Sequence, residues 1–584
     1  MTTASLLLRS LRHYRWWHLG LALAVALAAM VIAGSLAVGD SVRATLAEQA
    51  ANRIGQVQTV VVGGEKFFTE SLVGQLPGPA VPLIMVRGTV ALADGTRRVG
   101  GVNVIGVTEE FWSLARVPLR PAPAVGASAM NDGLARELGA GADDPLVVRV
   151  EKPSPLSKDA PLSGEADQTA TLRIKVGFRP AADAFGDFSL AASQSAPKNL
   201  FVPLAQLQEV LQQAGRVNAA LSTEADQAAV AGALARHWSL EDAGLAVTPL
   251  EALGQWDLST TRVFLEPAVA DALRGLFADA QGVLTYMVNR ISGPGTGVTP
   301  YSMATATDAL GLAADEVALT QWTAEDVGAA VGDEVNVDYY EVGRGRHLSS
   351  QSTRLKVARI LPMDSPVVRP DWTPPFPGIM DAPSCRDWKP GVAMDMTLIR
   401  DKDEAYWDTF RGTPKFFVSL ATGQKLWANR FGDMTALRIP REALDSAESL
   451  VAQLREKIQP QALGLTVASP AEAARLAVDQ SYDLGTLFLA MSFFLIVTAL
   501  LLVALMFLFN LESRAGQLGL LRAIGMEAGR IRRLVVVEAL VVAVGGGDRR
   551  VGGGDVVCTD DFAFFVGRVV GRGRGDEVCD GFPA

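Results

Sequence analysis

The residues of this chain with the clearest chemical purpose are arginines in residues 511–533, beside an apolar stripe that extends to Val535. Apolar residues recur there at steps of three and four, which is the spacing of one face of a helix. Arginines and two glutamates occupy the other faces. A basic amphipathic helix between two hydrophobic runs lies at a membrane surface, where anionic lipid headgroups are its simplest partners. The stripe consists of Leu518, Leu521, Ile524, Ala528, Ile531 and Val535, and the arginines are Arg514, Arg522, Arg530, Arg532 and Arg533.

Other reactive residue types form no catalytic or metal-binding pattern. The histidines are not spaced for zinc and are interpreted as surface or interfacial residues, and the cysteines make neither a disulfide framework nor a metal site. No phosphate loop of the GxxxxGK[ST] type occurs, so we expect no ATP bound in that way, no cofactor and no enzyme activity. A net charge of -10 argues against nucleic acid as a partner. These residues are His13, His18, His237 and His347, with Cys385, Cys558 and Cys579.

Two uncharged apolar runs are long enough to cross a lipid bilayer, because about 20 helical residues span a hydrocarbon core of roughly 30 Å. The first is residues 19–39, which follow a basic stretch at residues 1–18, and the second is residues 484–510. A cleavable signal peptide is the alternative for the first run, but such peptides have shorter apolar cores. We therefore predict two transmembrane helices.

Basic residues flank both predicted spans on one side, and short basic loops stay in the cytoplasm. The N-terminus, residues 1–18, and the segment 511–533 are therefore predicted to be cytoplasmic. Residues 40–483 are predicted to lie outside. Within them, Asp40–Ala51 are expected to continue the first span as a helix, and Pro470–Asp479 to form a helical stalk toward the second.

The segment after the second apolar run resembles the coupling segment of FtsX/MacB-type ABC transporter permeases. That family has the pattern E-x-R-x-x-E/Q-x-G-x-L/M-R-A-x-G after a transmembrane helix. The resemblance implies that residues 518–526 dock on a separate ATPase subunit, with Arg514 and Arg522 as polar contacts. The matching residues are Glu512, Arg514, Gln517, Gly519, Leu521, Arg522, Ala523, Ile524, Gly525 and Met526, followed by Glu538.

The same resemblance implies a multi-pass protein of the bacterial cytoplasmic (inner) membrane. Such a permease pairs with a second one, commonly as a homodimer, and couples ATP hydrolysis by its ATPase subunit to an extracytoplasmic domain. The outcome is export, lipoprotein extraction or mechanical transmission, with a periplasmic or lipidic substrate. Two other functions stay open: a two-span receptor or scaffold that binds a periplasmic partner, and an anchored extracytoplasmic enzyme.

Residues 40–483 read as short strands alternating with helices. The strand Gly101–Val107 leads into Phe111 and Trp112, and this corner resembles the GV-x-x-x-FW corner of the family's MacB-like periplasmic domain. We expect both aromatic residues to lie in the core. Residues 131–148 and 320–337 share one pattern, a short helix stopped by glycine, a turn and a strand. This predicts an internal duplication, with chance similarity as the alternative.

The segment 361–432 is rich in proline and tryptophan. Flexible linkers contain little tryptophan, so we predict an ordered excursion. It is either a loop packed on its own domain, which we favour, or a surface for a partner or substrate. Within it, Asp401–Glu404 lack the glycine and the distal glutamate of a calcium loop and are interpreted as a solvated turn.

The end of the chain departs from the family pattern of four spans. Residues 534–545 begin a third apolar run that is too short to cross a bilayer. Residues 546–584 contain no Leu, Ile or Lys. We interpret them as an aberrant, disordered tail that follows a frameshift near residue 545, which would remove two spans. A genuine disordered tail is the alternative.

The predicted fold is therefore an α+β membrane protein. Two transmembrane helices, with a third begun but incomplete, flank a large extracytoplasmic α+β domain. That domain is predicted to contain two related units, at about 56–200 and 285–440.

Overall fold

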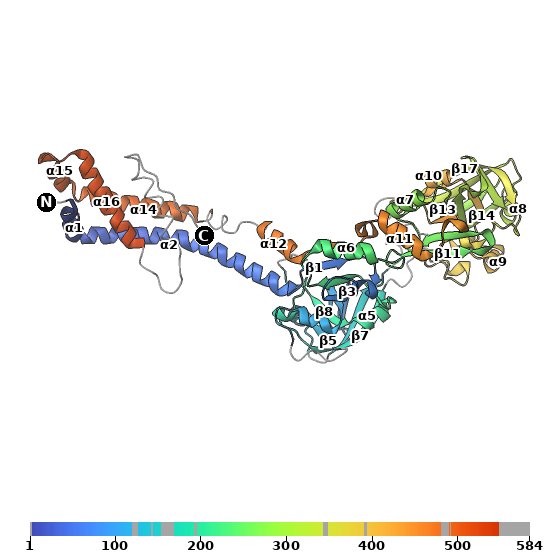
Figure 1. The fold of residues 1–584 in the computed structure, drawn as a ribbon, viewed down its shortest axis with the longest axis horizontal. Coiled ribbons are helices and arrows are strands. Elements are labelled where there is room, and N and C mark those ends of the chain that lie inside the picture. Colours follow the sequence, from blue (N-terminus) through green and yellow to red (C-terminus); the bar gives the residue numbers. More distant parts are fainter. Residues whose placement is uncertain are drawn as a thin grey trace. The chain divides into compact units, whose positions relative to one another are not determined.

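The computed structural model describes residues 3–119, 127–141, 144–153, 169–191, 195–342, 348–389, 394–480, 490 and 492–547 (Figure 1). The chain divides into two compact units, which are residues 1–48 with 475–584, and residues 49–474. We call the first the helical unit and the second the β-rich unit. The tail interpreted above as frameshifted lies outside the described residues from position 548 onward.

Two helices of the helical unit are long and apolar enough to cross a membrane, over Arg15–Gly34 and Phe493–Glu512. Large apolar side chains on them are exposed, such as Leu23 and Phe494, as contact with lipid requires. The helix that begins the first span runs unbroken to Ile54, so the helix expected over residues 40–51 continues it. The helices are α1 (Thr3–His13), α2 (Arg15–Ile54), α12 (Pro470–Gln480), α14 (Phe493–Glu512), α15 (Ala515–Ala523) and α16 (Ala528–Gly547).

The basic amphipathic stripe is divided between two helices rather than carried by one, so the expectation of a single helix was wrong. α15 ends at Ala523, and Gly525 follows with φ 90°. The N–H of Met526 donates to the carbonyl of Leu521, and the N–H of Gly525 to that of Arg522, each at 3.1 Å. This is a Schellman motif, which glycine permits because it adopts positive φ without a steric penalty.

In its described residues, the β-rich unit contains two nine-stranded sheets with the same strand arrangement. In each sheet six strands close on themselves through an additional antiparallel pairing, between β3 (Ala80–Leu92) and β6 (Pro145–Glu151) in one and between β13 (Gln281–Ser292) and β16 (Glu334–Val342) in the other. The alternating burial along β6 is the period-two pattern of a strand with one buried face. Closure leaves these six strands without a free edge.

The remaining strands complete this order. The first sheet runs β20 (Thr466–Ala468), β1 (Thr59–Val62), β10 (Ala219–Ser222), β3, β4 (Arg98–Val107), β8 (Asn199–Pro203), β5 (Ser128–Met130), β7 (Thr169–Phe178), β6. The second runs β11 (Leu245–Leu250), β12 (Gln255–Thr260), β19 (Ala436–Pro440), β13, β14 (Val298–Thr307), β18 (Phe416–Val418), β15 (Glu316–Thr320), β17 (Leu348–Leu361), β16. A separate small sheet pairs β2 (Phe68–Thr69) with β9 (Arg216–Val217).

Corresponding helices follow β5 and β15. α4 (Asp132–Leu138) begins where the Asn131 side chain accepts the Leu134 N–H, and α8 (Gln321–Val327) begins where Thr320 accepts the Thr323 N–H. Both end at a glycine of positive φ, Gly139 and Gly328. The two predicted helix–turn–strand patterns are therefore present, while their common origin stays a prediction.

Other helices pack between and around the sheets. One apolar cluster joins Ile84 of the first sheet, Leu437 of the second, and Leu234, Leu273 and Leu454 of three helices, so the two sheets share a core. The helices that pack between and around the sheets are α3 (Glu70–Val73), α5 (Leu204–Leu211), α6 (Gln227–His237), α7 (Pro267–Leu276), α9 (Asp401–Phe410), α10 (Leu420–Trp427) and α11 (Ala447–Lys457).

The aromatic residues pack as expected. Phe111 is fully buried and lies 4.8–5.8 Å, between ring centroids, from Phe185, Phe188 and Phe201. Trp112 is 5% exposed, so the core role predicted for both residues is confirmed.

The segment 361–432 packs on its own domain, as favoured. Its four tryptophans are all buried, and it supplies α9, β18 and α10. Residues Asp401–Glu404 were misinterpreted as a solvated turn: they begin α9, and Asp403 is buried beside Arg400 and Lys415.

Candidate functional site

The residues of the coupling pattern lie at the end of α14, along α15 and in the turn after it. Leu520 and Ile524 are 65% and 74% exposed, although both are large and apolar. Arg522 is exposed between them. Leu520 itself is not a residue of the pattern. Besides Arg522 and Ile524, the exposed pattern residues are Glu512, Gln517, Gly519, Ala523 and Gly525, and Leu521 and Met526 are half-buried.

Arg514 differs from the rest of the pattern, because it is buried. Its guanidinium forms an ion pair with Glu538 at 2.8 Å, from Nη1 to Oε2, and donates to the side chains of Asn510, at 3.4 Å, and of Ser10. It also lies over the Tyr14 ring, 4.6 Å from the centroid. Arg514 is therefore unavailable to a partner subunit in this conformation.

Glu538 is 1% exposed. Besides Arg514, its carboxylate has His18 as a neighbour, and His18 Nε2 lies 3.0 Å from Glu538 Oε1. The other ring nitrogen of His18 lies 3.4 Å from the Asn510 amide. His18 was expected to be a surface or interfacial residue; it is not on the surface, because the helices enclose it at 7% exposure. We call Ser10, His18, Asn510, Arg514 and Glu538 the polar cluster.

The polar cluster joins α1, α2, α14 and α16 at the point where the coupling segment begins. A buried charge without a partner is costly, and buried ionisable groups in apolar helices are therefore found paired. Here each of the two charged side chains has a partner on another helix. The cluster thus fixes the start of the coupling segment to the N-terminal helices, while α15 itself presents an exposed surface.

Sequence reasoning placed Arg514 and Glu538 in one pattern but did not predict their contact. The places of Ser10 and His18 in the cluster were not predicted, because these residues lie 504 and 492 positions from their partners Arg514 and Asn510. The only available signal was polar side chains next to or inside apolar helices. Among the described residues, no group of three or more His, Cys, Asp or Glu side chains is placed to hold a metal ion.

Comparison with known proteins bears on this segment. No curated protein matches the chain. Residues 489–547 match the family model for the FtsX-like permease C-terminal domain, and these residues contain α14, α15, α16 and most of the polar cluster. With two apolar helices of membrane-spanning length, this match indicates an integral membrane protein. Residues 489–547 are thus similar to an FtsX-like permease C-terminal domain, which is consistent with an FtsX/MacB-type permease.

Proposed function

We propose that this chain is the permease subunit of an ABC transporter, and that α15 and the turn after it dock on a separate ATPase subunit. The observation that carries the proposal is the exposed apolar pair Leu520 and Ile524 beside Arg522, within the segment that matches the FtsX-like domain. Large apolar side chains exposed together mark an interaction surface. The neighbouring guanidinium favours a protein cleft with polar groups over hydrocarbon.

The polar cluster supplies a route for force in this proposal. When the ATPase closes on ATP, it displaces α15, and the Arg514–Glu538 ion pair carries that displacement to α1 and α2. Because α2 is one helix from Arg15 to Ile54, it transmits a shift along its axis with little loss. The function is then coupling of ATP hydrolysis to movement of the β-rich unit.

The proposal also assigns the topology. The N-terminus and residues 511–533 are cytoplasmic, residues 40–483 lie outside a bacterial cytoplasmic membrane, and two permease chains pair with two ATPase subunits. The β-rich unit is then a MacB-like periplasmic domain whose two units arose by duplication. The shared strand order, closing pairs and helix caps support this assignment.

The test is co-purification of the full chain with an ABC-type ATPase encoded beside its gene. We expect Ile524→Asp and Arg522→Asp each to reduce ATPase recovery at least tenfold, because they place a charge in an apolar contact or reverse a polar one. Arg530→Asp, an exposed change on α16, is the matched control and should retain the complex. No capture by the natural chain, or equal capture by all variants, contradicts the proposal and favours a receptor or scaffold.

A further inference from the structure

A small cavity lies in the second half of the β-rich unit, where residues 385–388 and 399–415 lie beside residues 300–303 of β14. The centre of a water-sized group can move within about 20 Å³ of this cavity. That is enough for one such group, and the cavity opens to the surface. The walls are mainly aromatic and apolar, but three charged residues take part. The lining that matters is Tyr301, Trp388, Asp403, Trp407, Arg411 and Lys415.

Lys415 is the least satisfied of these charged groups. Its side chain is 6% exposed, and among the described residues its ammonium makes one hydrogen bond, to Asp403 Oδ1 at 3.5 Å. An ammonium has three N–H donors. The remaining sides face the rings of Trp322 and Tyr406, 4.4 and 4.9 Å from their centroids. Burial lowers the pKa of Lys415 to about 8.

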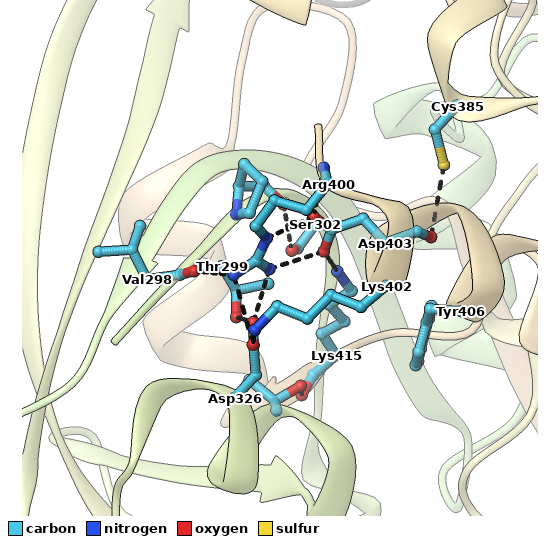
Figure 2. Close-up of polar contacts among 12 residues, drawn as sticks. Val298, Thr299, Ser302, Asp326, Cys385, Arg400, Lys402, Asp403, Tyr406 and Lys415 are labelled. Carbon is cyan, nitrogen blue, oxygen red and sulfur yellow. Dashed lines mark hydrogen bonds and ion pairs between the residues drawn. The ribbon is translucent and has the colours of Figure 1, made fainter. Parts of the chain in front are cut away.

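Asp403 is already shared with a second cation (Figure 2). Arg400 donates to it through Nε at 2.7 Å and Nη2 at 2.8 Å, and Arg400 and Lys402 also pair with buried Asp326. This network therefore contains three cations, Arg400, Lys402 and Lys415, and two carboxylates.

The cavity wall has further features of a binding site. Arg411 adds a second cation and adopts φ 51°, and Tyr301 adopts φ 25°, conformations that are unfavourable for residues with a side chain. Strained backbone is retained mostly at functional positions. The indole nitrogens of Trp388 and Trp407 are buried and have no hydrogen-bond acceptor in the described part of the chain.

We propose that this cavity receives one carboxylate oxygen of a small organic anion, with Lys415 and Arg411 as the cationic partners of the carboxylate. The aromatic walls formed by Tyr301, Trp388 and Trp407 then contact the apolar remainder of the ligand at the mouth. Such a site on the β-rich unit is independent of the docking of α15 on an ATPase.

The test measures binding of two carboxylates to the full chain in detergent micelles by carbon-13 and proton NMR line broadening. Formate is expected to bind, and formamide, its neutral isostere, at least tenfold more weakly. Phenylacetate is expected to bind more tightly than formate because its ring adds apolar contact. Equal binding of formate and formamide overturns the anion site, and phenylacetate binding no tighter than formate overturns the apolar contact.

Lys415→Met is expected to weaken phenylacetate binding at least tenfold and Arg411→Gln several-fold. Lys425→Met, an exposed lysine on α10 that does not line the cavity, is the matched control and should leave binding within twofold. Circular dichroism checks that each variant is folded. If Lys415→Met does not fold, the exposed Arg411→Gln variant and the pH profile carry the test. Unchanged binding in a folded variant of either residue contradicts the proposal.

The pH profile identifies the titrating group. Asp403, Arg400 and the Cys385 thiol influence Lys415, and the pKa of Cys385 is raised to about 12, chiefly by burial, so the thiol stays neutral at pH 9. The Tyr406 pKa is also raised by burial. Of the two cationic partners, Arg411 keeps its charge in this range and Lys415 loses it, so affinity should fall between pH 7 and 9. Lys415→Arg stays charged and should abolish this fall, whereas a pH-independent affinity in the natural chain overturns the assignment.

Discussion

Arg514 and Glu538 are buried charges that stabilise each other across two helices. Removing one partner from such a pair leaves an uncompensated charge, at a cost of about 3–5 kcal/mol. The Glu538 carboxylate also pairs with His18, and the Arg514 guanidinium also donates to Asn510 and Ser10. Removing either charge therefore weakens contacts among four helices.

We expect Arg514→Glu and Glu538→Arg each to lower the thermal unfolding midpoint of the full chain in detergent, and the double variant to recover part of that loss because the pair is restored with reversed sign. The exposed pair Arg530 and Glu527, at 3.6 Å, is the control. Its reversal should change stability by less than about 1 kcal/mol. If the double variant loses as much stability as the two single variants combined, Arg514 and Glu538 do not stabilise each other.

Lys415 makes the stability of the β-rich unit depend on pH. Its folded pKa, about 8, lies below the ordinary value of 10.5, so between these values the unfolded chain binds more protons than the folded one. Stability contributed by this group therefore rises as pH increases through that window.

The predicted measurement is the difference in unfolding midpoint between the natural chain and Lys415→Met, followed from pH 7 to 10. The unfolding midpoint of the natural chain should rise relative to that of the variant as pH increases, because deprotonation of Lys415 removes the cost of a buried ammonium. Lys425→Met should follow the natural chain throughout. A constant difference across this range shows that Lys415 does not titrate there.

Among the elements, α2 has the largest mechanical role in the proposed function, because it connects the polar cluster to the β-rich unit without a break. A helix resists bending only while its backbone hydrogen bonds continue. Glycine and serine interrupt them, whereas alanine extends the helix.

We therefore expect a Gly-Gly-Ser-Ser insertion after Ala44 to uncouple the two units while ATPase binding is kept. An insertion of four alanines at the same place is the matched control and should preserve coupling. The measurement is the nucleotide-dependent change in hydrogen exchange of the β-rich unit, in complex with the ATPase. Equal responses of the two insertion variants contradict transmission through α2.

Elements defined by local signals could be predicted from the sequence. The glycines that end α4 and α8 and the alternating valines of the strands act within a few residues of the chain. The contacts of Arg514, His18 and Lys415 could not be predicted, because each depends on which distant segments fold together. Gly525 was a local signal for the end of α15, but the apolar residues keep their helical spacing across it, and the sequence was therefore interpreted as one helix.

At the scale of the molecule, the β-rich unit begins and ends in adjacent strands. β1, which follows α2, pairs antiparallel with β20, which precedes α12, and Val60 lies opposite Ala468. The second sheet is contained in the chain between them, so the two connections to the helical unit leave from one edge of the first sheet.

This pairing limits the kinds of motion that the chain can transmit. If α2 and α12 advance together, the bonds between β1 and β20 carry no load. If one advances alone, the load reaches this strand pair at the end where Val60 lies opposite Ala468. Movement of α2 and α12 together is therefore tolerated. Movement of one helix alone would separate the valine-rich β1 from β20 and leave an edge able to pair with other chains.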